Sequence, residues 1–172
     1  MTLRFYSPPA RPGDEQERQR VVDASGIVRA PPDPTLHEIV VACARLFEAP
    51  MAAVTIVDRD RQWFAARVGL NAPETSRAVS FCAHAILVPD DMLLVRDATQ
   101  DVRFAGNPLV LFDPGIRFYV GVPITGAAGH AIGALCVIDR QPRTDALPLA
   151  ELATLAERAR RAIADIAARF HR

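Results

Sequence analysis

Two cysteines and one histidine carry the side chains with the most reactive chemistry in this chain. Cys82 and His84 stand two residues apart in SFCAHAI, and Cys136 lies in ALCVID. As metal ligands they are too few, because a structural zinc site needs four ligands and no second Cys/His cluster supplies them. Residues i and i+2 of a helix also point about 200° apart. The sequence therefore predicts no metal site. It leaves three interpretations of Cys82 and His84: packed core residues, pocket-lining residues, or a thiol nucleophile.

The stretch from Ile116 to Asp139 is predicted to form a central β-hairpin that positions Cys136. Its first half alternates between two faces, and its second half is apolar on nearly every residue, which is typical of a strand covered on both faces. A four-residue loop, 126–129, would place Tyr119 opposite Cys136. One face of the hairpin is then plain core. The other carries four candidate pocket residues: Arg117, Tyr119, Gly121 and Cys136.

Arg117 has two interpretations. Its guanidinium could pair with the phosphate of a cyclic nucleotide. The alternative is an ion pair with an acidic residue of the chain, for which there are three candidates: Asp97, Asp101 and Asp139.

The composition excludes several classes of function. The chain has 172 residues, half of them hydrophobic, which predicts one domain with a sizeable core. Twenty basic residues, all arginine, balance twenty acidic ones, so neither nucleic-acid binding nor lysine chemistry is indicated. No signal peptide and no apolar run long enough for a membrane span is visible. We therefore expect a cytoplasmic protein with its three cysteines reduced.

The remaining elements predict a single α+β domain. Residues 1–13 are proline-rich and are expected to form a flexible arm, with the domain spanning residues 14–172. The predicted elements, in order, are helices at 14–24 and from Pro34, strands at 51–58 and 62–68, a short helix after Ser80, a strand at 92–96, a short helix after Asn107, the hairpin, and a helix at about 148–170. Strands joined by hairpins favour an antiparallel sheet with helices packed on it.

Several segments in this order resemble a GAF domain of the kind found in bacterial sensor histidine kinases and diguanylate cyclases. They are VTIVDRDRQWFAARVGL, SFCAHAI, VRDATQDVRFAGNPLV, IRFYVGVPI and IGALCVID, within about residues 34–168. The resemblance implies a central antiparallel sheet of five or six strands. It also implies terminal helices on one face, and a pocket under short helices and loops on the other.

The resemblance implies a non-catalytic regulatory domain that senses a small molecule and signals through its terminal helices to a dimer mate or a signalling partner. The expected pocket residues are Cys82, His84, Arg117, Tyr119, Gly121 and Cys136. The alternatives are a ligand-free dimerisation module and a thiol enzyme of the free methionine sulfoxide reductase type. That enzyme's Val-Cys-Gly signature is absent here, and bilin attachment would place Cys directly before His. No cofactor is identified.

Overall fold

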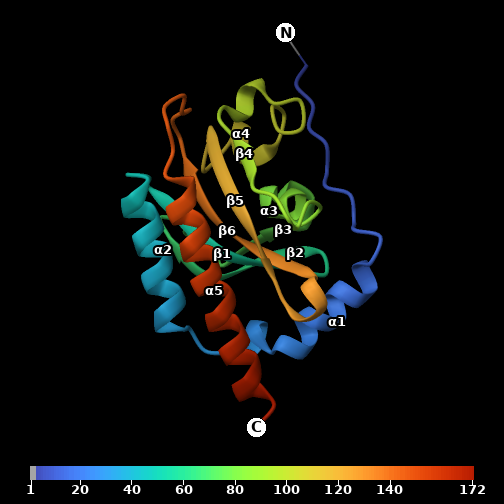
Figure 1. Ribbon diagram of the computed structural model, residues 1–172. Helices are drawn as coiled ribbons and strands as arrows, with labels where there is room; N and C mark the ends of the chain where they lie inside the picture. Colours follow the sequence, from blue (N-terminus) through green and yellow to red (C-terminus); the bar gives the residue numbers. More distant parts are fainter. Residues whose placement is uncertain (1–2) are drawn as a thin grey trace.

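Six antiparallel strands form one sheet in the order β3-β2-β1-β6-β5-β4. The computed structural model describes residues 3–172, and Figure 1 shows the sheet running through the middle of the molecule. The strands are β1 (Met51–Asp58), β2 (Arg61–Val68), β3 (Glu74–Ser76), β4 (Leu93–Val95), β5 (Phe118–Thr125) and β6 (Ala131–Asp139). The predicted strands are all present. The short β3 was expected to be loop.

Helices cover both faces of this sheet. On one face lie α1 (Glu15–Ser25), α2 (Pro34–Leu46) and the long α5 (Leu149–Phe170), with α2 and α5 side by side (Figure 1). On the other lie α3 (Phe81–Ala85), α4 (Pro108–Leu111) and their loops, which together we call the cover layer. The predicted α+β architecture is confirmed. None of the helices in residues 3–172 is both long and apolar enough to cross a lipid bilayer.

The two central strands explain why both layers exist. Every residue of β1 and of β6 is buried. In β1, Val54 and Ile56 belong to the core under α1, α2 and α5, whereas Met51 and Ala53 belong to a second core under the cover layer. A strand that is apolar on both faces must be covered on both faces, so the sheet separates two cores.

Side-chain caps begin three helices where the sequence indicates. Asp33 accepts a hydrogen bond from the amide of Leu36 at the start of α2. Ser80 does the same for α3 and Asn107 for α4. Such caps satisfy amides that have no partner inside the helix, and here they fix where both short helices of the cover layer begin.

The predicted register of the hairpin is wrong by two residues. Tyr119 lies opposite Ile138, and Gly121, not Tyr119, lies opposite Cys136. The amide of Gly126 donates to the carbonyl of His130, so the loop is one residue shorter than expected, and a bulge beside Ile124 adds the second residue. Because side chains alternate with a period of two, a two-residue shift keeps each on its predicted face.

Ile116 departs from the prediction in another way. We expected it on the face of Phe118, but β5 begins only at Phe118, and Ile116 packs with the cover-side core instead. The alternation that holds within a strand does not extend to residues before it.

The N-terminal segment lies extended along the cover layer (Figure 1). The amide of Ser7 donates to the carbonyl of Arg103, and the carbonyl of Phe5 accepts from the amide of Gly106. Met1 and Thr2 of the predicted arm lie outside the described residues, and the flexibility of the arm stays a prediction.

A buried ionic cluster joins α1 to residues 77–80, the segment directly before α3, which we call the strap. Arg18 is 1% exposed and donates to the carbonyl of Val57 and to the carboxylate of Glu15. Arg77, in the turn before α3, donates to the same carboxylate with a distance of 3.0 Å from Nη2 to Oε2. Burial raises the pKa of Glu15, but the hydrogen bonds from Arg18 and Arg77 outweigh it and lower that pKa from 4.5 to about 2.

Replacing Glu15 by Gln should destabilise the protein and reduce its acid sensitivity. The pKa of Glu15 is lower in the folded state than in the unfolded state. The ionised carboxylate therefore contributes fully to the free energy of unfolding above pH 4.5, and this contribution disappears as the pH falls towards 2. We expect Glu15→Gln to lower the free energy of unfolding by about 1–2 kcal/mol at pH 7, after allowance for solvent screening. The difference from the parent should vanish near pH 2.

Denaturant unfolding between pH 7 and pH 2.5 measures this difference. Glu17→Gln is the matched control, because Glu17 lies on the same helix, is 56% exposed and pairs with the exposed Arg20. Equal effects of the two substitutions at pH 7 would contradict the role given to Glu15.

Candidate functional site

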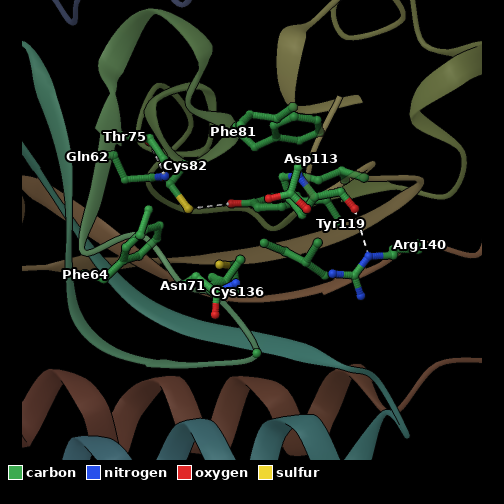
Figure 2. A pocket seen from close by; sticks show the side chains of 17 residues that line it. Gln62, Phe64, Asn71, Thr75, Phe81, Cys82, Asp113, Tyr119, Cys136 and Arg140 are labelled. Atoms are coloured by element: carbon green, nitrogen blue, oxygen red, sulfur yellow. Dashed lines mark hydrogen bonds between the residues drawn. The ribbon is translucent and has the colours of Figure 1, made fainter. Parts of the chain in front are cut away.

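A cavity lies between the cover layer and the sheet, on the face predicted to hold a pocket. Its volume is about 140 Å³, and Figure 2 shows the side chains around it. Phe64, Leu70, Phe81, Leu109, Ile116 and Ile138 form its apolar wall. Gln62, Thr75, Cys82, Tyr119 and Cys136 add polar atoms or thiols. An apolar cavity with a few convergent polar groups is the usual form of a small-molecule site.

The volume of the cavity limits what it can hold. An engineered cavity of about 150 Å³ lined by apolar side chains accepts benzene or xenon, whereas sites for drug-sized ligands occupy roughly 300–1,000 Å³. At about 140 Å³, this cavity accommodates a group of about six non-hydrogen atoms. In this arrangement a cyclic nucleotide or a tetrapyrrole does not fit.

Tyr119, Cys136 and Ile138 of the sheet line the floor of the cavity, with small residues beside Cys136. Cys136 lies between Ala53 of β1 and Gly121 of β5 in the sheet. A Cβ atom at Gly121 would lie only 2.1 Å from the hydroxyl oxygen of Tyr119. The side chain of Tyr119 therefore lies over Gly121, and the absence of a side chain there is what allows it.

The hydroxyl of Tyr119 points at the thiol of Cys82. Their Oη and Sγ atoms are 3.0 Å apart, and both side chains are buried (Figure 2). Ser80 positions Cys82 by capping α3 with its own side-chain oxygen, and its hydroxyl donates to Gln62 at 2.6 Å. The start of α3 is thus anchored to β2, and Cys82 in its first turn faces the sheet.

Hydrogen bonds make Cys82 the most acidic thiol of the cavity. Burial alone raises the pKa of Cys82, but hydrogen bonds from Cys136, Thr55 and Tyr119 bring it below the ordinary value. The pKa of Cys136 is raised because its hydrogen bond to Cys82 keeps it protonated. Burial, followed by the charge of Cys82, raises the pKa of Tyr119. Of these three groups, Cys82 is therefore the one that loses its proton most readily.

Among residues 3–172, the charged side chains that line the cavity lie at its mouth. Asp113 and Arg140 line it there and are exposed to solvent. The Nε of Arg140 donates to the carbonyl of Pro114 at 2.9 Å, as Figure 2 shows. This bond joins the loop after β6 to the loop before β5. Within residues 3–172, no three His, Cys, Asp or Glu side chains gather closely enough to hold a metal ion.

Four of the six predicted site residues lie at the cavity, and we call these four the first group. Cys82, Tyr119 and Cys136 line the cavity together. Gly121 lies in its floor beneath Tyr119 without lining it. The other two residues, His84 and Arg117, point elsewhere. Their part in ligand binding, like that of the first group, stays a prediction.

His84 and Arg117 both serve the chain itself. The Nε2 of His84 lies 2.9 Å from the carbonyl oxygen of Ser7, so this side chain holds the N-terminal segment. Burial lowers the pKa of His84, which favours the neutral ring. Arg117 donates to the carbonyls of Val110 and Ile116, at 2.8 and 3.0 Å, and not to any of the three predicted carboxylates.

The segment from Gly69 to Phe112 was expected to cover this face of the sheet, but the candidate pocket residues included none from the part directly after β2. Gly69, Leu70, Asn71, Ala72 and Thr75 line the cavity from what was expected to be plain loop. Gly69 has a φ of +73°, and a Cβ atom there would lie 1.9 Å from the carbonyl oxygen of Pro50. A glycine directly after a strand was the available signal that the chain turns sharply and closely at this point.

The family model for the GAF domain matches residues 31–164. The chain belongs to the GAF domain family. It is 46% identical over 143 residues to a cyclic di-GMP phosphodiesterase of Pseudomonas aeruginosa, a match that covers 83% of this chain and 24% of that protein. The chain therefore spans about a quarter of the length of this relative.

Solved structures with the same fold include other GAF domains. The GAF domain of an Acinetobacter phosphoenolpyruvate-protein phosphotransferase superposes with a TM-score of 0.63 at 19% identity, over 91% of this chain and 96% of that one. Free methionine-R-sulfoxide reductase from Neisseria meningitidis, solved with its substrate, gives a TM-score of 0.56 at 20% identity, over 96% and 99%. At these identities the likeness concerns the fold alone.

Replacing Gly121 by Ala should displace Tyr119 and destabilise this GAF domain. The added methyl group collides with the hydroxyl oxygen and ring of Tyr119, and overpacking of this kind typically costs about 1–3 kcal/mol. Thermal or denaturant unfolding measures the change. Gly13→Ala is the control, because nothing lies within 4 Å of a Cβ atom there.

Removing the tyrosine should relieve the collision. In a double-mutant cycle, Gly121→Ala should cost much less in the Tyr119→Ala background than in the parent. Strictly additive effects would show that the tyrosine side chain does not lie over Gly121.

Proposed function

We propose that this GAF domain is a regulatory module that binds a small, largely apolar molecule in the cavity over Cys136. The observation that carries the proposal is the cavity itself. It is enclosed by apolar side chains from the sheet and the cover layer, and a compact polar group formed by Cys82 and Tyr119 faces it. A ligand with an apolar body and one hydrogen-bonding end suits this lining.

The proposed signal passes from the cover layer to the terminal helices. Ser80 binds Gln62 at one wall of the cavity, and Arg77, three residues earlier, holds Glu15 of α1. A ligand that shifts the strap between these residues also changes the position preferred by α1. The ligand would shift the populations of two conformations of the domain, which requires that it bind more tightly to the conformation with one position of the strap than to the other.

The proposed recipient of the signal is a dimer mate or a partner protein in the cytoplasm. The terminal helices α1 and α5 pack against each other, so a change in α1 reaches the long α5 directly. The relative from P. aeruginosa is a cyclic di-GMP phosphodiesterase of which this chain spans 24%, and a signalling context of that kind supports a regulatory role. The phosphodiesterase activity is that of the whole relative.

A thiol enzyme of the free methionine sulfoxide reductase type is the second candidate. One observation favours it: the hydrogen bonds to Cys82 lower its pKa although burial opposes this, and a thiolate is the nucleophile in such chemistry. The fold is shared with the N. meningitidis enzyme. Incubation of the protein with methionine sulfoxide and dithiothreitol tests this hypothesis. The enzyme hypothesis is wrong if no methionine is formed, or if the Cys82→Ser variant forms methionine as fast as the parent.

Filling the cavity should abolish ligand binding with little loss of stability. A screen of benzene-sized fragments against the reduced protein should find compounds that raise the melting temperature. A fragment present at 100 times its dissociation constant should raise the free energy of unfolding by about 2.7 kcal/mol. Ile138→Phe adds volume where Ile138 lines the cavity, so we expect this variant to remain folded and to lose the ligand-induced shift.

Ile124→Phe is the matched control for this experiment. Ile124 lies on the neighbouring strand but faces the core under the terminal helices. We expect this variant to lose about 1–3 kcal/mol through overpacking while it keeps the ligand-induced shift. Fragments that bind the parent and Ile138→Phe equally well would place the binding site elsewhere.

A further inference from the structure

Reversible ligand binding does not require two thiols, yet two thiols meet in the cavity. Cys82 belongs to the cover layer and Cys136 to the sheet, and both are buried and reduced. Gly121 lies opposite Cys136, the Tyr119 hydroxyl lies over Gly121, and the Cys82 sulfur is 3.0 Å from that hydroxyl. Both thiols thus line the same cavity, and the Tyr119 hydroxyl lies between Cys82 and the part of the sheet beside Cys136.

We infer that Cys82 and Cys136 are a redox-active pair that a small hydroperoxide converts into a disulfide between α3 and β6. The inference rests on the proposed function, because it assigns a covalent form of regulation to the same cavity. It concerns oxidation of the protein itself and requires no turnover of a substrate.

The surroundings of the pair suit a small neutral oxidant. Both sulfurs line a cavity that otherwise presents mainly apolar side chains, so charged oxidants are disfavoured and hydrogen peroxide fits. The hydroxyl of Tyr119 is placed to donate to the departing oxygen of a peroxide attacked by Cys82.

The third cysteine provides a contrast within the same chain. Cys43 lies in α2, in the core on the opposite side of the sheet. Burial raises the pKa of Cys43 to about 12. The pKa of Cys82 lies below its ordinary value for the reasons given above. Because the thiolate is the reactive form, Cys82 reacts first and Cys43 stays reduced.

The chemistry proceeds in two balanced steps. The thiolate of Cys82 attacks one oxygen of hydrogen peroxide, the O–O bond breaks, and the released hydroxide takes a proton to become water, leaving a sulfenic acid on Cys82. The thiol of Cys136 then attacks the sulfur of Cys82, the S–O bond breaks, and a second water departs as the disulfide forms. Two thiols lose two electrons and two protons, and one peroxide is reduced to two waters.

The disulfide would change the site that binds the ligand. It would fix α3 covalently to β6, the strand that provides the floor of the cavity. It would also replace two separate thiols by a bridge across the space they line. Oxidation would thereby hold the cover layer in one position, independently of any ligand.

Thiol counting on the intact protein tests the inference. The reduced parent, unfolded and alkylated, should carry three labels, one for each free cysteine. After exposure to hydrogen peroxide it should carry one label, on Cys43, and its mass before alkylation should fall by two hydrogen atoms. Non-reducing peptide mapping should recover the peptides of Cys82 and Cys136 joined within one chain. Reduction with dithiothreitol should restore all three labels.

Three variants separate the roles of the residues. Cys136→Ser should stop at a sulfenic acid on Cys82 that dimedone traps, and Cys82→Ser should keep both of its thiols. Cys43→Ser should oxidise at the parental rate. Tyr119→Phe should slow the oxidation about fivefold, the factor expected for one ordinary hydrogen bond. Circular dichroism confirms that each variant is folded, and the mapping of the parent does not depend on any of them.

Several results would overturn the inference. One is a parent that keeps three thiols under peroxide that fully oxidises glutathione in the same tube. Others are a disulfide that joins two chains, or one that contains Cys43. The failure of this inference and that of the proposed function are distinguishable. If the reduced protein binds fragments but forms no disulfide, only the redox inference fails. If the disulfide forms but no fragment binds, the proposed ligand-binding function fails and the redox inference stands.

Discussion

The two central strands of the sheet, β1 and β6, are buried on both faces, and the rest of the structure follows from that constraint. Every side chain of these strands is buried, on one face of the sheet or on the other. At roughly 25 cal/mol per Å² of apolar surface, leaving either face open would cost more than the net stability of a typical domain. The sheet therefore needs two covering layers, and the order of elements along the chain supplies them.

The two layers differ in what they can build. The terminal helices are long and amphipathic and fill their side of the sheet with a continuous core. The cover layer consists of a five-residue helix, a four-residue helix and loops, which cannot pack as closely. On its side the sheet presents Ala53, Gly121 and Ala134 around Cys136. Gly121 makes room for the ring of Tyr119, and the cavity lies between this ring, Cys136 and the short elements of the cover layer.

Glu15 connects the two layers around the edge of the sheet through polar contacts. Its carboxylate receives hydrogen bonds from Arg18 of its own helix and from Arg77 of the strap before α3. Two cations on one carboxylate give that contact a fixed geometry. A change in the cover layer is thus linked to α1 by specific side chains as well as by the shared sheet.

Much of this arrangement could be predicted from the sequence, because it depends on local patterns. The strand Met51–Asp58, the capped starts of α2, α3 and α4, and the face occupied by Tyr119 and Cys136 follow from alternation and capping. The pairing partner of Tyr119 did not follow, because a shorter turn and a bulge beside Ile124 are not visible in the pattern.

The partners of individual side chains were also beyond local reasoning. Arg117 binds backbone carbonyls of α4 and its own loop, and His84 binds Ser7, which is 77 positions away in the chain. Charge and spacing alone suggested a phosphate or a carboxylate for Arg117. Long-range contacts with carbonyl oxygens leave no trace in the residue types involved, since every residue carries one.

Crystallography of the reduced protein under xenon pressure tests whether the cavity over Cys136 is open to a ligand, because xenon enters apolar cavities of this size. We predict a xenon atom between Phe81, Ile138 and Cys136, inside the cavity that these side chains line, and none in the core between α5 and the sheet. A cavity filled by its own side chains, with no xenon beside Cys136, would contradict the account.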